Sequence, residues 1–300
     1  MSTERQLLEV AERSYPPPPR AFDALVRTRR RRERNRRTAT TVLALVLAAG
    51  AAWLAVHGFL GPSAAPRPGS KVPSGLGPEA ASHLGLAWYG SIGGVSAPPV
   101  VADGMVFAGT SDRRLYAFSA GCGSNGRPCA PAWTGTVGGG IQYSSPAVGG
   151  GLVLVGAGDG VLYAFPQSCG SDGATCRPRW TFRAGASLAD SSPLVRGDVA
   201  YVAADRVYAV ALATGKLLWT GPGRALTSTF GMTAPAASGG SVFVATVEGA
   251  LEALPESCGV TRCRPSWTAS LGATPTSQPV VADGLVYVGA GRRLYAFADT

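Results

Sequence analysis

The six cysteines are the residues whose types and spacing first suggest chemistry. They form three local pairs, Cys122/Cys129, Cys169/Cys176 and Cys258/Cys263. A metal centre would need closer CxxC spacing or accompanying histidines, whereas the chain has only His57 and His83. We therefore expect three disulfides rather than metal or redox use, and disulfides require an oxidising compartment.

The sequence lacks the residues that nucleophilic catalysis needs. The only histidines, His57 and His83, lie outside the repeats. No repeat can therefore contain a Ser/His/Asp or Cys/His catalytic group. We accordingly expect no catalytic residue, no cofactor-binding residue and no metal ligand. We expect a binding module rather than an enzyme.

The acidic residues recur at turns. Carboxylates precede the third β-type run of four units, at Asp112, Asp159, Asp205 and Glu248. Two further turns hold Asp103 and Asp283. Tight hairpins favour Asp and Gly for backbone reasons alone, so we expect these carboxylates to be structural.

Two arginine pairs offer a candidate binding surface. Arg113 and Arg114 occupy the same position in the first unit as Arg292 and Arg293 in the last. They could form one basic patch for an anionic polymer or protein, or they could be ordinary solvated charges at strand ends. The recurrent tyrosines are expected to pack between units: Tyr116, Tyr163, Tyr208 and Tyr295.

These residues are positioned by an internal repeat. A proline-led phrase recurs at Pro99, Pro146, Pro193, Pro235 and Pro279, with spacings of 47, 47, 42 and 44. A tryptophan series runs in step with it, at Trp88, Trp133, Trp180, Trp219 and Trp267. A period of 40 to 50 residues indicates a repeat architecture.

Each repeat divides into four short β-type runs separated by turn residues. In the first unit these are Pro99–Val101, Met105–Gly109, Arg114–Phe118 and Ala132–Val137. Four antiparallel strands per period predict an all-β, five-bladed β-propeller over residues 85–300. We expect the strand at 86–91 to pair with Arg293–Phe297 and close the ring, because closure removes exposed edges.

The phrase LYAF and the stretch VYAVALATGKLLW resemble the pyrroloquinoline quinone-like propeller repeat. Thr214, Gly215, Lys216 and Trp219 match the family motif, while Ala211 stands one residue before the family's position. The resemblance covers residues 85–300. It implies that the five tryptophans dock between adjacent blades.

The same family includes quinoprotein dehydrogenases and the propeller lipoprotein of outer-membrane protein assembly. The quinone enzymes usually have eight blades and a bound calcium held by carboxylate and amide side chains. This chain has five units and a single asparagine in them, Asn125. We therefore expect no cofactor, and a quinone-dependent oxidoreductase is the least favoured alternative.

The segment before the repeats has three parts. Residues 1–37 are basic, with 11 arginines against 5 acidic residues, and we expect them to be cytoplasmic. Residues 38–60 form an apolar run without Asp, Glu, Lys or Arg, about 34 Å long as a helix, which is enough to span a bilayer. Residues 61–84 are rich in Pro, Gly and Ser and are expected to be a linker.

Arginines before the apolar run orient it with the N-terminus inside and the repeats outside. A cleaved signal peptide is the alternative, although a 37-residue leader is long for one. The run Arg27–Arg37 is expected to contact anionic lipid headgroups. Basic residues are concentrated there, so we expect no nucleic-acid partner for the whole chain.

The arrangement of FDALV, an arginine run and a single span is similar to membrane-bound regulators of high-GC Gram-positive bacteria, including anti-sigma-like proteins. Two hypotheses follow. The first is a membrane-anchored extracytoplasmic propeller that binds or scaffolds an unidentified protein or polymer. The second is a transmembrane signalling protein whose propeller senses an external ligand.

Overall fold

The computed structural model describes residues 84–94, 97–124, 126–222 and 234–298. All of them lie within one compact unit, Pro78–Thr300. The expected cytoplasmic segment, the apolar run and nearly all of the linker lie outside the described residues. Within the described ranges, no helix has the length and apolar character that a membrane crossing needs.

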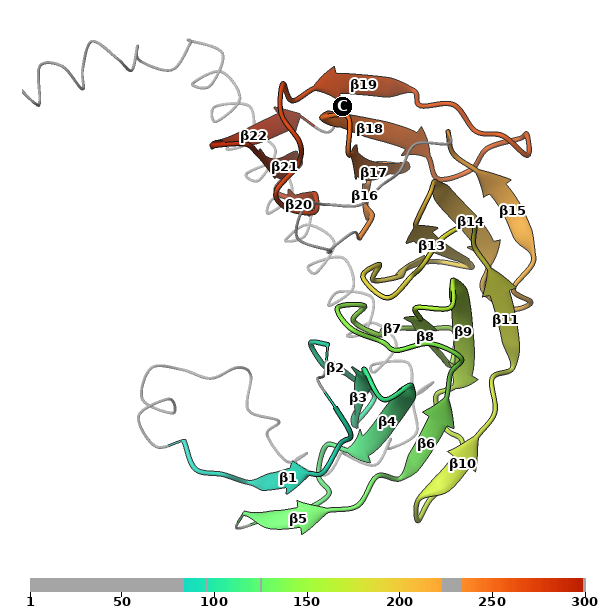
Figure 1. The fold of residues 1–300 in the computed structure, drawn as a ribbon, viewed down its shortest axis with the longest axis vertical. Helices are drawn as coiled ribbons and strands as arrows, with labels where there is room; N and C mark the ends of the chain where they lie inside the picture. Colours follow the sequence, from blue (N-terminus) through green and yellow to red (C-terminus); the bar gives the residue numbers. More distant parts are fainter. Residues whose placement is uncertain (1–83, 95–96, 125, 223–233, 299–300) are drawn as a thin grey trace, which may run out of the picture. The chain divides into compact units, whose positions relative to one another are not determined.

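Apart from the two-stranded pair of β1 and β5, five sheets follow one another along the described chain, and the main strands of each are antiparallel (Figure 1). Sheet 1 contains β2 (Val100–Ala102), β3 (Met105–Thr110), β4 (Arg114–Ser119) and β6 (Trp133–Thr136), and sheet 2 contains β7 (Ala147–Gly149), β8 (Leu152–Gly156), β9 (Val161–Pro166) and β11 (Trp180–Arg183). Sheet 3 contains β12 (Leu194–Arg196), β13 (Val199–Ala203), β14 (Val207–Ala211) and β15 (Leu217–Thr220), and sheet 4 contains β16 (Ala236–Ser238), β17 (Ser241–Thr246), β18 (Ala250–Pro255) and β19 (Trp267–Ser270). Sheet 5 contains β20 (Val280–Ala282), β21 (Leu285–Ala290) and β22 (Arg293–Ala298). Strands without helices in the described residues confirm the all-β expectation.

Three short strands lie outside this four-strand plan. Strand β1 (Trp88–Gly90) runs parallel to β5 (Arg127–Cys129), and β10 (Ala174–Cys176) runs parallel to β6. Both β5 and β10 come from the loops that carry the cysteines, which the sequence did not indicate as strands. Each of them pairs with the outer strand that precedes its unit, β5 with β1 and β10 with β6.

Backbone conformation explains why Asp-Gly occupies the tight turn between the first two strands of the first and fifth units. Asp103 and Gly104 have φ of 46° and 75°, and Asp283 and Gly284 have φ of 54° and 75°. Two-residue hairpins need positive φ at both central positions, which Asp-Gly tolerates. The structural role expected for Asp103 and Asp283 agrees with this conformation.

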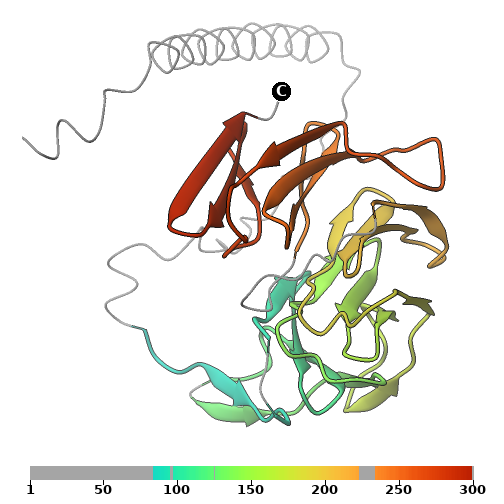
Figure 2. The same ribbon diagram turned by 45° about the horizontal axis from the view of Figure 1, so that its top comes forward.

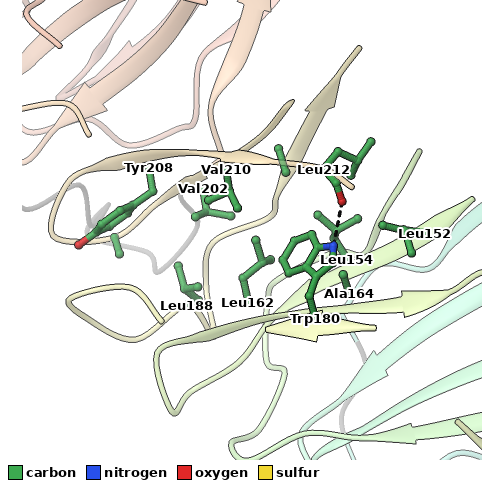
Figure 3. Packing of buried hydrophobic residues seen from close by; sticks show 12 residues of the cluster. Leu152, Leu154, Leu162, Ala164, Trp180, Leu188, Val202, Tyr208, Val210 and Leu212 are labelled. Atoms are coloured by element: carbon green, nitrogen blue, oxygen red, sulfur yellow. Dashed lines mark hydrogen bonds between the residues drawn. The ribbon is translucent and has the colours of Figure 1, made fainter. Parts of the chain in front are cut away.

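The core lies between sheets rather than within one. Four clusters of buried side chains join sheets 1 and 2, 2 and 3, 3 and 4, and 4 and 5. Figure 3 shows the one between sheets 2 and 3, where Leu162 and Leu188 meet Val202 and Val210. Sheets 2, 3 and 4 are therefore each stabilised by a neighbouring sheet on both faces.

Alternation along the third strand of a unit produces this arrangement. In β4, Leu115 and Ala117 belong to the cluster shared with sheet 2, whereas Tyr116 and Phe118 belong to a cluster with Trp88 of β1. Successive side chains of a strand point to opposite faces. Both faces of LYAF are consequently buried, which explains its unbroken apolar run.

The expected ring closure is wrong for this structure. Strand β1 pairs with β5 of the first unit, in both views of the chain, and the single strand paired with β22 among the described residues is β21 (Figures 1 and 2). Trp88 accordingly shares no sheet with Tyr295. The strand that β1 does pair with is the cysteine-loop strand β5, as β6 pairs with the cysteine-loop strand β10, and this partner was not expected from the repeat.

A glycine next to a sheet junction provides the first test. A Cβ added to Gly156 would lie 2.6 Å from the Leu188 carbonyl oxygen and 2.8 Å from its Cβ. Because backbone atoms cannot yield cheaply, Gly156→Ala should lower the free energy of unfolding by about 1–3 kcal/mol. Thermal unfolding of the full chain would show this as a melting temperature lower by several degrees.

Gly121→Ala is the matched control, since no atom lies within 4 Å of the added Cβ. It should leave the melting temperature unchanged. Equal melting temperatures for both variants would contradict the close approach of sheets 2 and 3.

Candidate functional site: the sheet junctions and their outer loops

The tryptophan of each outer strand reaches the following sheet. Its indole N–H donates to a backbone carbonyl just beyond the third strand of the next unit: Trp88 to Ala120 at 3.0 Å, Trp133 to Gln167 at 3.1 Å, Trp180 to Leu212 at 2.8 Å and Trp219 to Glu256 at 3.4 Å. Figure 3 shows the Trp180 bond. Trp267 packs edge-on against Phe297, with ring centroids 5.2 Å apart.

The cysteine loops cover these tryptophans from outside. All three expected pairs are disulfides, with Cα–Cα separations of 6.0, 5.7 and 5.9 Å, which confirms the pairing. The second cysteine of each pair is buried with the tryptophan of the preceding unit: Cys129 with Trp88, Cys176 with Trp133 and Cys263 with Trp219. Each disulfide therefore holds a junction closed.

The third unit has no cysteines, and there a glycine turn covers the tryptophan of the preceding unit. Gly215 has φ of 71°, and a Cβ there would lie 2.6 Å from the Trp180 ring. The short turn thus lies directly on the indole. A side chain at this position would both clash and require a strained backbone.

A second recurring contact lies near the turn that starts the third strand. The Tyr163 hydroxyl donates to the Asp159 carboxylate at 2.6 Å and accepts from the Gly138 N–H at 2.9 Å. Tyr208 does the same with Asp205 and Gly185, at 2.7 and 2.9 Å. Since the glycine belongs to the preceding unit's connection, each set ties two sheets together.

Tyr116, Asp112 and Gly93 form the same set at 3.0 and 3.1 Å. Later units vary it. Buried Glu252 replaces the tyrosine in the fourth unit, and the Tyr295 hydroxyl donates to the Leu271 carbonyl in the fifth. The sequence placed these tyrosines between units and these carboxylates at turns, but it did not indicate their hydrogen bonds.

Electrostatics at these sets follow from burial and hydrogen bonding. Burial raises the pKa of Tyr163 and of Tyr208, and the hydrogen bonds to Asp159 and Asp205 add to the effect. Burial also works to raise the pKa of Asp205, but hydrogen bonds from Tyr208 and Arg206 outweigh it and the net pKa is lowered. In the Tyr208 set the neutral tyrosine hydroxyl donates to the charged carboxylate, so one hydrogen bond raises the pKa of Tyr208 and lowers that of Asp205.

The predicted basic patch is divided between two sheets. Arg113 and Arg114 lie at the start of β4 in sheet 1, and Arg292 and Arg293 lie at the start of β22 in sheet 5. No pairing joins these two sheets among the described residues. All four side chains are exposed. Since ring closure was the reason to expect them together, the patch stays a prediction.

A second set of exposed arginines was not predicted from the sequence as a binding surface. It flanks the second cysteine of each disulfide, and we call it the outer arginine series: Arg127, Arg177, Arg179, Arg262 and Arg264. All five side chains are exposed. No ion pair holds them among the described residues. Their signal in the sequence is the repeated Arg-Pro beside a cysteine.

The series lies at the outer edge of the sheets. Arg127 is in β5, beyond β1, and Arg177 follows β10, which forms the edge of sheet 1 beyond β6. Arg262 forms a parallel bridge with Thr220 of β15. Across the described residues, no three His, Cys, Asp or Glu side chains gather in a way that could hold a metal ion. The exposed guanidinium groups make charge recognition the chemistry that this edge offers.

Removing one disulfide tests its role at the junction. Cys169→Ala with Cys176→Ala should lower the free energy of unfolding by about 2–3 kcal/mol, because a short loop in the unfolded chain is released and a buried contact to Trp133 is lost. Denaturant unfolding of the full chain measures it. Ser171→Ala, in the same loop, is the control, and an unchanged stability in the double variant would contradict the role.

Alkaline pH tests the third junction. Burial raises the pKa of Tyr201 to about 12, and the Glu256 charge adds to it. An unfolded tyrosine titrates near pH 10, so the stability from Tyr201 is complete below pH 10. It should fall as the pH rises to 12, by about 2–3 kcal/mol. Denaturant unfolding at pH 9 to 12 measures the slope.

Tyr201→Phe should make that slope shallower, at the cost of the 2.9 Å hydrogen bond that the hydroxyl donates to the Glu256 carbonyl. Tyr143→Phe, at an exposed position, should leave the slope as it is. The same slope in Tyr201→Phe as in the natural chain would count against the buried phenol.

Comparison with known proteins agrees with this geometry. Residues 203–300 match the family model described as outer membrane protein assembly factor BamB. The crystal structure of BamB from Moraxella catarrhalis is similar with a TM-score of 0.52 and 16% identity, over 68% of this chain and 57% of that one. The computationally designed Ika8 protein is similar with a TM-score of 0.51 and 11% identity, over 68% and 58%.

The chain thus spans less than two thirds of the length of these structures. No curated protein matches it. Identities this low speak for the fold alone. Together with the repeat matched at 203–300, they support a PQQ-like β-propeller fold for the described part of the chain.

Proposed function

We propose that this protein is a membrane-anchored, extracytoplasmic binding module that uses the outer edge of its propeller to hold a partner protein. The similar family is described as an assembly factor, which supports protein binding as the role of the fold. Function depends on sites carried by a fold and not on the fold itself. The site offered here is the outer arginine series.

One observation carries the proposal: the arginines are exposed, while the loops that present them are fixed. Each loop is closed by a disulfide, and its second cysteine is buried against a tryptophan of the neighbouring sheet. A fixed loop loses little conformational entropy on binding. Rigid presentation of charge is therefore built into every cysteine-bearing junction.

The chemistry of arginine determines what the partner would look like. A guanidinium presents donors in a planar fork that matches a carboxylate in two parallel hydrogen bonds. The series includes Arg177 and Arg179 at one junction and Arg262 and Arg264 at another. The partner proposed is a protein surface with spaced Asp or Glu side chains.

Anchoring follows from the apolar run at 38–60 and the arginines before it, with the propeller outside. Disulfides support an oxidising compartment for the propeller. The signalling alternative rests on residues 1–37, outside the described residues, and it differs by requiring a cytoplasmic partner for that segment.

Site-specific photo-crosslinking in cells that make the full chain tests the binding surface. A photoreactive residue in place of Val260, which is exposed between Cys258 and Cys263, should give a discrete protein adduct. Arg262→Glu with Arg264→Glu in the same chain should reduce the adduct about tenfold, because reversed charge repels an acidic partner.

The controls use other exposed positions. Arg292→Glu with Arg293→Glu should leave the adduct unchanged, and a photoreactive residue at Leu217, in the cysteine-free unit, should give none. An adduct that is insensitive to the Arg262 and Arg264 reversals would refute the assignment of this surface. Loss in the Arg292 and Arg293 variant would return it to the patch first predicted from sequence.

A further inference from the structure

The last strand, β22, carries the LYAF motif that is buried in β4, but in β22 much of the motif is exposed. Strand β22 reads RLYAFA and β4 reads RLYAFS. Leu294 is 74% exposed, whereas its counterparts Leu115, Leu162 and Leu251 are fully buried. Ala296 is exposed too, and Ala117 is not. Sheet 5 thus leaves uncovered the apolar face that other sheets bury.

In the other units, two neighbours cover this face. One is the sheet's own outer strand, which pairs in a fixed register, Tyr116 with Thr134 and Ala117 with Trp133. The same register joins Tyr163 to Thr181 and Ala164 to Trp180. The second neighbour is the next sheet, whose side chains share a cluster with Leu115 or Leu162.

Strand β1 and sheet 1 form the complementary half of such a junction. Strand β6 is held between β4 on one edge and the parallel strand β10 on the other. Strand β1 has the counterpart of β10, namely β5, and has no partner on its other edge among the described residues. It is an outer strand without the sheet that would carry it.

The side chains of β1 have the identities that the missing position demands. Trp88 already donates to Ala120 in sheet 1, as Trp133 donates to Gln167 in sheet 2. A Cβ added to Gly90 would lie 2.4 Å from the Phe118 ring, as one added to Gly135 would lie 2.5 Å from Phe165. The junction chemistry is therefore complete on the β1 side.

We infer that β22 receives β1 from a second copy of this chain, so that the two half-junctions make one whole junction between molecules. The register of the other units then places Trp88 opposite Ala296, Tyr89 opposite Tyr295, Gly90 opposite Leu294 and Ser91 opposite Arg293. The face of sheet 1 that holds Tyr116 and Phe118 lies behind β1 and covers Leu294 of the partner copy.

The contact is heterologous, since different surfaces of the two copies meet. Such an interface forms a closed ring of copies if the rotation closes and an extended chain if it does not. Strand pairing of this kind satisfies the free backbone groups of both edges and removes them from competition with other chains.

Paired thiols distinguish exchange between copies from pairing within one. Ser91→Cys and Arg293→Cys, both at exposed positions, are made in separate full chains with different tags, mixed in nonionic detergent and treated with a short bis-maleimide. The cysteines among the described residues are all in disulfides, so the new thiols react alone. The expected product is the mixed dimer, at least tenfold above control.

The control pairs Arg293→Cys with Arg183→Cys, which occupies the same register position in β11, whose edge is already taken by β9. A mixed dimer from this pair at equal yield would mean random collision and would overturn the inference. So would an exclusively intramolecular link in a chain carrying both Ser91→Cys and Arg293→Cys.

Leu294→Glu provides a second, independent readout. Leu294 is exposed in the single chain, so the substitution leaves the fold of one copy intact while placing a charge in the proposed contact. Light scattering of the natural full chain should show a mass above that of one copy that falls on dilution, and Leu294→Glu should abolish it. A single-copy mass for the natural chain at all concentrations would assign the β22 edge to another occupant, such as a further segment of chain.

Discussion

The hydrogen bond from a tryptophan indole to a carbonyl just beyond the following sheet's third strand is the contact around which four of the junctions are built, while Trp267 packs against Phe297 at the junction of sheets 4 and 5. The hydrogen bond needs an indole on an outer strand, a carbonyl beyond the neighbouring third strand, and enough room between them. A buried indole N–H without an acceptor would cost about 1–3 kcal/mol. The ring itself contributes further through its large apolar area. Geometry and energy at these four junctions are thereby fixed together.

Several features of the sequence follow from that contact. Glycines stand where the chain passes a ring, as Gly135 does beside Phe165 and Gly215 beside Trp180. Disulfide loops pack against three of the indoles, and at two of these junctions a tyrosine and aspartate set adds a second contact. Packing, polar satisfaction and covalent closure all act between sheets. Within the part of the chain that the structure describes, a single sheet has no buried side-chain cluster of its own that would stabilise it in isolation.

Much of this was predictable from the sequence, because it is periodic. Strands recur in each unit, disulfide pairs in three of the five and turn carboxylates in most, and the expected run Met105–Gly109 differs from β3 by one residue. The parallel strands β5 and β10 were not predictable, since three residues such as RPC carry no period of their own. The partner of β1 was not predictable for a related reason, because the repeat pattern points to the last unit, whereas the observed partner is the non-periodic strand β5. The outer arginine series was visible as Arg-Pro beside cysteine, but its exposure depended on which side of the loop met the indole.

The turn at Gly215 has a consequence for how the molecule responds to its surroundings. Three of the junctions are secured by sulfur and one, between sheets 2 and 3, by a glycine lying on an aromatic ring. A change of redox potential can act on the former and not on the latter. The contact between sheets 2 and 3 is therefore indifferent to reduction. Nearest-neighbour coupling of the kind found in repeat proteins would make any reductive loosening begin at the three sulfur-bearing junctions.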